Sequence, residues 1–480
     1  EKKVQWNLAK QGGWNRYEIL SNECADKLDE AIEDEKKDVE EVMEIFEKIH
    51  TKVKFKSFGK VNTAKKKEAK EDKPEDNKGQ ETEEEKAKEL LQKQVEDVDK
   101  EIEEIRRKQK GTVGTIYEVA KRVRGGKKVP MQPSAIQNPE TGKLVVSRTQ
   151  IKSVTLKYCK ETLSNNPPKP GFERHADIQE ELQKLRMEDT NGHFMANKEL
   201  FEKVLNKFKS SSKHSYDFLT KAGGKFQNSC YKMCDKMFQS ECFPGSFKDT
   251  ILHMIFKGKG KKEELSSNRF IHCKSWLPRL AEACLVEGGI KRHMVEESSR
   301  FQVGGQAGHR AEELLFCLKS VISKHKVQGK VIIGQCHDVS KFFDKEVASD
   351  TMDVLYRRGV DPKVCRLWAK LNETRIQVRT GVGNTEKAEI GTVIGQGTIG
   401  GAIASQGSLD DGIRDQFQGS QEEIRYGSVE MGPLIFQDDL LESSPGVIEA
   451  RAANIRVATV MHQKRLTLNE DKSVCLVWGT

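Results

Sequence analysis

Two adjacent aspartates, Asp438 and Asp439, lie between two short apolar runs and constrain the fold more than any other feature of this sequence. The first run is Pro433-Leu434-Ile435-Phe436, and the second is Leu440-Leu441. This pattern predicts a strand, a tight turn and a second strand, with both carboxylates at the tip of the hairpin. Two carboxylates this close repel each other, and a bound divalent cation would keep both ionised. Because Asp-Asp also suits an ordinary turn, the hairpin alone leaves both interpretations open.

A third carboxylate follows another β-type run about a hundred residues upstream. Residues 330–336 have the sequence Lys-Val-Ile-Ile-Gly-Gln-Cys, and His337-Asp338 follows them directly. If the two strands are neighbours, Asp338 and Asp438 can bridge two Mg²⁺ ions about 3.5–4 Å apart, the arrangement used in nucleotidyl transfer. Mg²⁺ prefers a few carboxylates together with substrate phosphates, and this set supplies the carboxylates.

Six segments in one order resemble the reverse transcriptases of non-LTR (LINE-like) retrotransposons, over about residues 115–480. Four resemble the palm motifs A to D of that family: Asp338-x-x-Lys341-x-Phe343-Asp344, Gly395-Gln396-Gly397, Phe436-Gln437-Asp438-Asp439, and Leu466-x-Leu468-Asn469-x-x-Lys472-Ser473. Two lie upstream and resemble a fingers motif and the segment before motif A: Asn268-Arg269-Phe270-Ile271, and Gln302-Val303-Gly304-Gly305 with Gly308-His309-Arg310. An ordered series is far more specific than any single motif.

Three departures from the family pattern stand out. Gln437 replaces the Ala that is usual before the aspartates, and Phe270 replaces a typical Pro. The chain begins with Glu1 rather than Met and stops at Thr480, just after the fourth palm motif. We therefore expect both ends to be truncated, and the thumb, which grips the primer–template duplex and which this fragment would need for activity, to be missing.

The resemblance assigns roles to individual residues. It makes Asp338 and Asp438 the essential metal ligands, with Asp439 supporting them and the backbone carbonyl of Val339 as a further ligand. Five residues would contact the incoming nucleotide: Lys257, Arg269, Phe343, Gln396 and Lys472. Arg and Lys suit a triphosphate, and Lys472 could also protonate the leaving pyrophosphate. A solvated surface position remains the alternative for Lys472, as a simple Gly-rich turn does for Gln396.

Phe343 would lie beneath the nucleotide sugar and exclude a 2′-hydroxyl. The alternative is an ordinary core phenylalanine. If motif A continues as a strand, the neighbouring Phe342 faces the opposite side.

Composition agrees with a nucleic-acid partner without requiring one. The 480 residues carry a net charge of +8, with 36% hydrophobic and 32% charged residues. This is polar for a globular protein and suggests an extended, solvated part. The eleven cysteines lack disulfide-framework spacing, which favours free thiols in a reducing compartment. No apolar run reaches membrane-spanning length and no signal peptide opens the chain, so we expect an intracellular protein of nucleus or cytoplasm, not a secreted one.

The spacing of apolar and charged residues divides the chain into four regions. Residues 1–58 have apolar side chains at helical spacing and predict one or two amphipathic helices. Residues 59–88 form a Lys/Glu-rich stretch that predicts a disordered linker. Residues 89–164 predict a helical, coiled-coil-like connector, a turn at 138–142 and a helix near 149–163. They also contain a basic cluster that could follow a phosphate backbone or be merely solvated: Lys121, Arg122, Arg124, Lys127 and Lys128. Residues 165–480 would form the fingers and palm.

The expected fold is α/β (α+β), a right-hand polymerase with an antiparallel palm sheet behind a helical, partly disordered N-terminal region. The expected activity is RNA-directed DNA synthesis with Mg²⁺ or Mn²⁺, on an RNA template and a DNA primer, from deoxynucleoside triphosphates. One alternative is a decayed or domesticated retroelement protein that only binds nucleic acid. Another is an RNA-templated RNA polymerase, which Phe343 disfavours. Zinc is disfavoured because Cys230, Cys234, Cys242 and His253 lack a second ligand pair.

Overall fold

The computed structural model describes residues 11–58, 132–163, 194–210 and 216–479, apart from 195, 297, 300–301, 305–307, 341, 347, 418–423, 427–428 and 465. The expected linker at 59–88 and most of the expected connector lie outside the described residues. So does the whole basic cluster: Lys121, Arg122, Arg124, Lys127 and Lys128. The chain divides into two units, Glu1–Lys60 with Pro133–Thr480 and Val61–Gln132, and the fold described here is that of the first.

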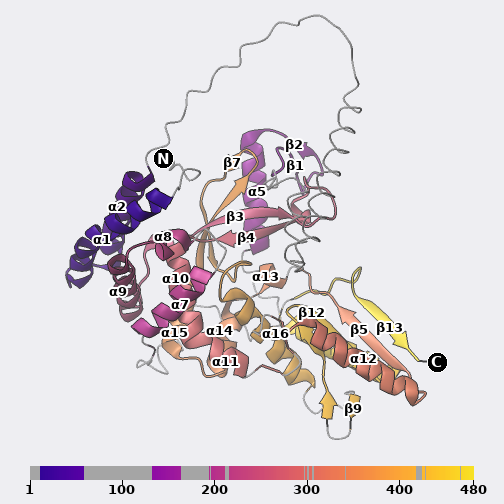
Figure 1. Ribbon diagram of the computed structural model, residues 1–480. Helices are drawn as coiled ribbons and strands as arrows, with labels where there is room; N and C mark the ends of the chain where they lie inside the picture. Colours follow the sequence, from indigo (N-terminus) through magenta and orange to yellow (C-terminus); the bar gives the residue numbers. More distant parts are fainter. Residues whose placement is uncertain are drawn as a thin grey trace, which may run out of the picture. The chain divides into compact units, whose positions relative to one another are not determined.

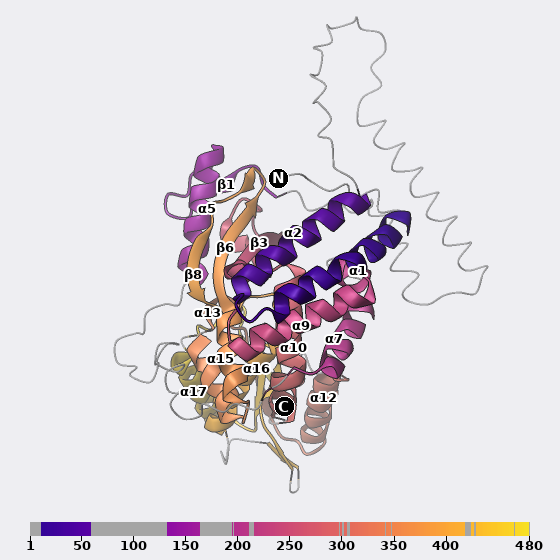
Figure 2. The ribbon, with the colours of Figure 1, turned by 90° about the vertical axis from the view of Figure 1, so that its left-hand side faces the viewer.

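The N-terminal region forms two helices, α1 (Gln11–Glu33) and α2 (Val39–Phe58). They lie side by side against α9 (Gly224–Ser240), as Figure 2 shows. The apolar positions at helical spacing are buried, which confirms the expected amphipathic helices. The ring of Phe46 lies 5.9 Å from that of Phe226 and 5.7 Å from that of Trp276. Helices at the start of the chain therefore share one apolar core with helices some 180 residues later.

Seven further elements contribute most of the remaining side chains of this core. They are α7 (Lys198–Ser210), α8 (Asp217–Thr220), α10 (Trp276–Leu285), a π-helical turn (Val286–Ile290), α11 (Lys291–Glu296), α14 (Ala348–Arg357) and α15 (Pro362–Asn372). Trp368 of α15 is completely buried among them. Cys230 and Cys234 are also buried in this core, and all eleven cysteines are free thiols.

A five-stranded sheet lies next to this helical core. Its order is β4 (Asn268–Cys273), β3 (Asp249–Phe256), β6 (Glu373–Thr380) and β7 (Gly383–Asn384), with β8 (Ala388–Thr392) also paired to β6. β3 and β6 run parallel, and the other pairs are antiparallel. Short 3₁₀ turns precede β3 and β4, at Gly245–Lys248 and Leu265–Ser267.

Helix α5 (Arg148–Leu163) covers one face of this sheet (Figure 1). It confirms the helix expected near 149–163, and the hairpin of β1 (Ile136–Gln137) and β2 (Leu144–Val145) confirms the turn expected at 138–142. The side chains of β3 alternate between buried and exposed, so the opposite face stays open. That open face carries the exposed Ile255 and, directly across from it on β4, the exposed Arg269.

The second large sheet is antiparallel throughout. Its order is β11 (Leu434–Phe436), β12 (Asp439–Ser444), β5 (Ile332–His337) and β13 (Val474–Trp478). Leu440 and Ile435 face α16 (Gly401–Phe417) and α17 (Val447–Gln463). Ile332 and Leu434 face α12 (Ala311–Val327) on the other side. A small hairpin of β9 (Ile424–Tyr426) and β10 (Val429–Met431) precedes β11.

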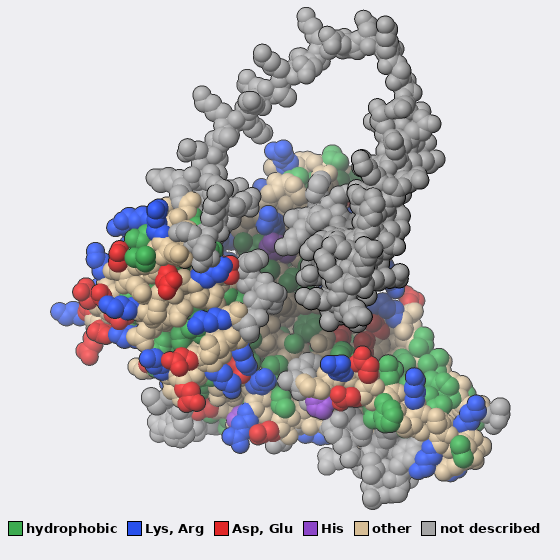
Figure 3. Space-filling view, in the orientation of Figure 1, with side chains coloured by type: hydrophobic (Ala, Val, Ile, Leu, Met, Phe, Trp, Pro, Cys, Tyr) green, Lys and Arg blue, Asp and Glu red, His purple; other side chains and the backbone are tan. Residues whose placement is uncertain are grey.

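The described residues thus form a mixture of helices with one large mixed sheet, one large antiparallel sheet and two small hairpins. The edge strand β13 exposes Val474, Leu476 and Val477, and Figure 3 shows hydrophobic side chains gathered over that end of the sheet. Among the helices that the structure describes, none is long and apolar enough to cross a membrane.

Glu346 is a buried carboxyl group between α13 (Phe342–Lys345) and α14, only 5% exposed. The hydroxyl of Thr351 donates to its Oε1 at 3.1 Å. Burial raises the pKa of Glu346 from 4.5 to about 7, against the opposing positive charge of Lys464. Between these two pH values the folded protein keeps a proton that the unfolded chain has lost, so stability falls as pH rises.

We predict that Glu346→Gln removes this decrease of stability with rising pH. Between pH 5 and pH 7.5 the free energy of unfolding of the native chain should decrease, and that of the variant should not. The difference between the two decreases should be up to about 3 kcal/mol. Urea unfolding at several pH values measures the difference. Glu312→Gln, at an exposed position of α12, is the control and should leave the pH slope as it is. Parallel pH profiles for Glu346→Gln and the native chain would contradict the prediction.

Candidate active site

The paired aspartates lie where the sequence predicted, at the tip of a hairpin. β11 ends at Phe436, β12 begins at Asp439, and these two residues are paired. The turn between them consists of Gln437 and Asp438, and Gln437 has φ +62°. A two-residue hairpin turn of the primed type requires a positive φ at its first position. Gln437 therefore adopts a left-handed conformation that costs about 1–2 kcal/mol in a residue with a Cβ.

Asp338 reaches the hairpin because β5 is the neighbour of β12. The two strands are antiparallel, and their last pair joins Leu440 to His337. Continued by one step, this register would place Asp439 opposite Asp338, and the two carboxylates are close enough for the charge of Asp338 to raise the pKa of Asp439. Since successive residues face opposite sides of a sheet, these two carboxylates lie on the face away from Leu440 and its helices. The structure thus confirms that the two strands predicted from sequence are neighbours.

The pKa values of Asp438 and Asp439 are both raised by their surroundings. Burial raises the pKa of Asp438, and the negative charges of Asp439 and Asp338 raise it further, while Arg269 acts in the opposite direction. Partial desolvation and the charge of Asp338 raise the pKa of Asp439, and Lys472 opposes this shift. Negative charge is therefore concentrated here, and a cation would stabilise it.

The segment that resembles motif D forms hydrogen bonds with both backbone groups of Asp338, its carbonyl and its amide. The amide of Asn469 donates to the Asp338 carbonyl at 2.8 Å, and the Asp338 amide donates to the hydroxyl of Ser473 at 3.3 Å. An isolated bridge pairs Val339 with Leu468. The hydrogen bonds that flank this bridge use the Asp338 carbonyl and the Ser340 amide, and so do not involve the Val339 carbonyl proposed as a ligand.

Lys472 lies directly against the proposed metal ligands. Its Nζ is 2.9 Å from Oδ2 of Asp338. Within the part of the chain that the structure describes, no group of three or more His, Cys, Asp or Glu side chains is arranged to hold a metal ion. The donor chemistry nevertheless suits Mg²⁺, because carboxylate oxygens are hard ligands and the raised pKa values of Asp438 and Asp439 reflect a repulsion that a cation would reduce. Lys472 supplies part of that compensation.

The two proposed fingers residues differ in their surroundings. Arg269, exposed on the open face of the five-stranded sheet, is close enough to Asp438 to influence the pKa of that carboxyl. The ammonium group of Lys257 instead donates to the carbonyl of Ser266 at 2.8 Å, at the end of the β3–β4 hairpin. The structure therefore brings Arg269 to the carboxylates and keeps Lys257 in a local contact.

The Gly-Gln-Gly loop, residues 395–397, is hydrogen-bonded to β4. The amide of His272 donates to the carbonyl of Gln396 at 2.8 Å. A Cβ on Gly395 would lie 2.4 Å from the His272 ring, and one on Gly397 would lie 2.8 Å from Cγ2 of Ile271. Gly397 also has φ +103°. Both positions require glycine because a Cβ at either would clash with β4. Gln396 is half-buried between them and lies beside the strand that carries Arg269.

A buried glutamate that the sequence did not single out supports the same loop. Glu282 of α10 is only 4% exposed, and its carboxylate accepts the amide of Gly400 at 2.9 Å. This places a negative charge at the N-terminus of α16, where the helix dipole favours it. The signal in the sequence was a single acidic residue within the otherwise mostly apolar helix Trp276–Leu285.

The expected strand at Phe342 and Phe343 is wrong. β5 ends at His337, and both phenylalanines belong to the one-turn helix α13. They therefore do not face opposite sides of a sheet. Phe342 is buried in the core under the antiparallel sheet, and Phe343 packs against the same core while remaining half-buried. Their rings meet edge to face at 5.4 Å. Phe343 is still the more accessible of the two.

Comparison with models of known protein families gives no match for this chain, and comparison with curated proteins gives none either.

The ion pair between Lys472 and Asp338 leads to a prediction about cation binding. Lys472→Met should make Mn²⁺ bind about two- to fivefold more tightly, because the cation no longer displaces a paired ammonium group from a partly exposed carboxylate. Electron paramagnetic resonance of free Mn²⁺ measures the affinity. Lys319→Met, on the exposed side of α12, is the control and should leave the affinity unchanged. Weaker binding by Lys472→Met would show that Lys472 assists the cation rather than competing with it.

Proposed function

We propose that this chain is an RNA-directed DNA polymerase similar to those of non-LTR retrotransposons. It would add deoxynucleotides to the 3′-hydroxyl of a DNA primer on an RNA template. The observation that carries the proposal is the register of β12 against β5, which makes Asp338 and Asp439 neighbours at the hairpin of Asp438. In this reading the antiparallel sheet is the palm, and the five-stranded sheet with its helices is the fingers of a right-hand polymerase.

Asp338 and Asp438 would hold Mg²⁺ or Mn²⁺, with Asp439 and the carbonyl of Val339 in support. When bound, the cations would lower the pKa of the primer hydroxyl and neutralise charge on the leaving pyrophosphate. The protein itself orients the carboxylates. The hairpin fixes Asp438. The hydrogen bonds of the Asp338 backbone, whose carbonyl accepts the Asn469 amide and whose amide donates to the Ser473 hydroxyl, fix Asp338.

Basic and polar groups around the carboxylates suit a nucleoside triphosphate. Arg269 can pair with phosphate oxygens through two parallel hydrogen bonds, and Lys257 would reach the same phosphates from the β3–β4 hairpin. Lys472 can give a proton to the departing pyrophosphate. Gln396 offers both a donor and an acceptor to the nucleotide or the template base. A protein of this kind would work in the nucleus or the cytoplasm.

A protein that only binds nucleic acid remains the second candidate. The pairing of Lys472 with Asp338 is the observation that favours it, because a lysine can substitute for a cation at a site that no longer binds one. The two candidates differ in one measurable property: the polymerase extends a primer when a divalent cation is present.

We predict that the chain extends a DNA primer on an RNA template only with Mg²⁺ or Mn²⁺, and that Asp338→Asn or Asp438→Asn slows extension at least about a thousandfold. Gel-based extension is measured with the chain itself and with a fusion that adds a polymerase thumb after Thr480. Asp471→Asn, exposed in the turn that contains Lys472, is the control and should extend normally. Unchanged extension in either active-site variant would refute the site. Duplex binding without extension in either protein would favour the second candidate.

Sugar selection supplies a separate prediction. A Phe343 ring beneath the ribose would exclude a 2′-hydroxyl by contact, at a cost of about 1–3 kcal/mol, which is about a five- to two-hundredfold bias. Phe343→Val should therefore raise ribonucleotide incorporation sharply, as measured by competitive single-nucleotide addition. Phe342→Val should lower stability and leave the sugar preference intact, because Phe342 is only 2% exposed. Relaxed preference in Phe342→Val alone would overturn the assignment of Phe343.

A further inference from the structure

A buried glutamine from outside the hairpin contacts its strained residue. Gln302 is only 2% exposed. Its Nε2 donates to the carbonyl of Gln437, and its Oε1 accepts the amide of Gln437, both at 3.4 Å. The same Oε1 accepts the amide of Gly304 at 3.0 Å. One side-chain amide thus satisfies both backbone groups of the residue that has φ +62°.

The backbone on either side of Gln302 extends this contact. The amide of Val303 donates to the carbonyl of Ile435 at 3.1 Å, and Gln302 pairs with Ile435 as an isolated parallel bridge. Gly304 approaches so closely that a Cβ there would lie 2.2 Å from the backbone nitrogen of Gln437. No side chain fits at that distance, so a residue other than glycine would push the hairpin away. We call residues 302–304 the hairpin clamp.

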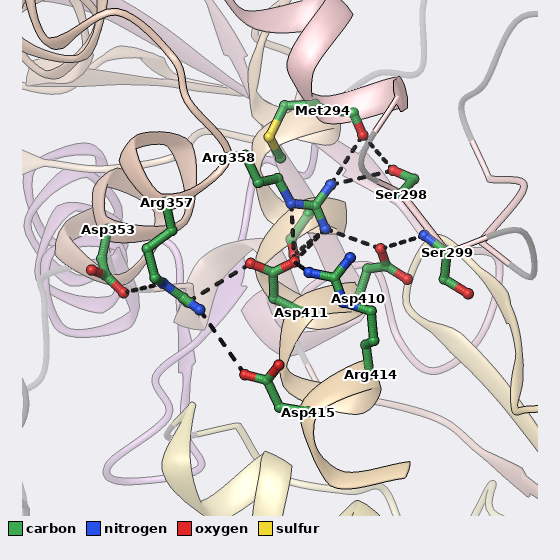
Figure 4. A network of polar contacts seen from close by, with 11 residues as sticks. Met294, Ser298, Ser299, Asp353, Arg357, Arg358, Asp410, Asp411, Arg414 and Asp415 are labelled. Atoms are coloured by element: carbon green, nitrogen blue, oxygen red, sulfur yellow. Dashed lines mark hydrogen bonds and ion pairs between the residues drawn. The ribbon is translucent and has the colours of Figure 1, made fainter. Parts of the chain in front are cut away.

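The hairpin clamp is anchored in the protein interior. The amide of Gln302 donates to the carbonyl of Ser299 at 3.0 Å, and the amide of Ser299 donates to Oδ2 of Asp410 at 2.9 Å. Asp410 belongs to α16 and pairs with Arg358 at 3.0 Å. Figure 4 shows the guanidinium of Arg358 between Asp410 and Asp411, with the Ser299 amide directed at Asp410.

This anchor resists displacement. Arg358 and both aspartates have side chains no more than 2% exposed. Removing one member of such a buried charge network leaves the others without a partner, so the network holds its geometry firmly. The contacts then run without a break from Arg358 through Asp410, Ser299 and Gln302 to Gln437. The next residue along the chain is Asp438.

We propose that Gln302 is a positioning residue for the carboxylate of Asp438. It holds Gln437 in the left-handed conformation that the turn requires, and in this way it fixes the direction in which the neighbouring carboxylate projects. The effect on catalysis rests on the proposed polymerase function, whereas the clamping of the hairpin does not. The Gln302 side-chain amide does not contact substrate in this role. Removing it therefore lowers the rate only by changing the position of the Asp438 carboxylate.

Amide hydrogen exchange tests the clamp without any enzymatic assay. In Gln302→Leu, the peptide that spans residues 434–441 should exchange about tenfold or more faster than in the native chain, because the hairpin loses two hydrogen bonds. Gln227→Leu is the matched control. The Nε2 of Gln227 donates to the carbonyls of Leu219 and Ala222 in the helical core, away from the hairpin tip. It should leave exchange at 434–441 unchanged.

Two further variants keep the test decisive if Gln302→Leu does not fold. Gln302→Met keeps the length of the side chain but loses both the donor and the acceptor, and it should increase exchange about as much as Gln302→Leu. Gly304→Ala should disturb the hairpin at least as much as Gln302→Leu. Its control is Gly224→Ala, where a Cβ meets no atom within 4 Å. Native exchange rates at 434–441 in the Gln302 variants would overturn the proposal.

The catalytic consequence is read from steady-state primer extension with the same proteins. Gln302→Leu should lower kcat about tenfold or more, leave the KM for deoxynucleotide within about twofold, and raise the Mg²⁺ concentration needed for half-maximal rate. Faster exchange with unchanged kcat and Mg²⁺ requirement would show that the clamp does not position Asp438. If neither the native chain nor its thumb fusion extends a primer, the polymerase proposal fails, and the exchange comparison still decides whether Gln302 holds the hairpin.

Discussion

The pairing of β12 with β5 is the interaction on which the candidate site depends. Leu440 opposite His337 sets the register, and one more step along both strands brings Asp439 beside Asp338. Side chains alternate between faces along a strand, so a slip of one residue would turn these carboxylates toward the helices and Leu440 toward solvent. Burial of Leu440 against α16 and α17 therefore fixes the position of the acidic side chains as well.

Concentrating three carboxylates at one place has an electrostatic cost that the surrounding elements reduce. The pKa values of Asp438 and Asp439 are raised, and each of the two opposing cations comes from a different element. Arg269 belongs to the five-stranded sheet, while Lys472 lies in the turn before β13. Residues about two hundred positions apart thus stabilise the same charge. A divalent cation would do so more strongly, which is why we interpret the site as one that works with a metal.

Close backbone contacts explain why glycines occur beside the site. Gly304 meets the backbone of Gln437, Gly395 meets the ring of His272, and Gly397 meets the backbone and side chains of β4. In each case two segments that are distant in sequence approach to a distance that excludes a Cβ. The hairpin and the Gly-Gln-Gly loop are consequently held by contacts from other elements, so their conformations depend on the whole fold rather than on the turns alone.

The sequence by itself determined the local structures. Apolar spacing determined the helices at 11–58, the turn residues determined the β1–β2 hairpin, and the apolar runs around Asp438 determined a hairpin with its carboxylates at the tip. These features arise from interactions between residues close in the chain, whose periodicity and turn chemistry are visible in sequence.

Only the tertiary structure decided how these parts combine. It placed Asp338 beside Asp439, paired Lys472 with Asp338, and put α1 and α2 into the core of later helices. It also made Phe342 and Phe343 helical, where the sequence suggested a strand. Partners in such contacts lie tens to hundreds of residues apart, and no local pattern specifies them. Burial of apolar faces and the pairing of strands select them, because only one arrangement satisfies both at once.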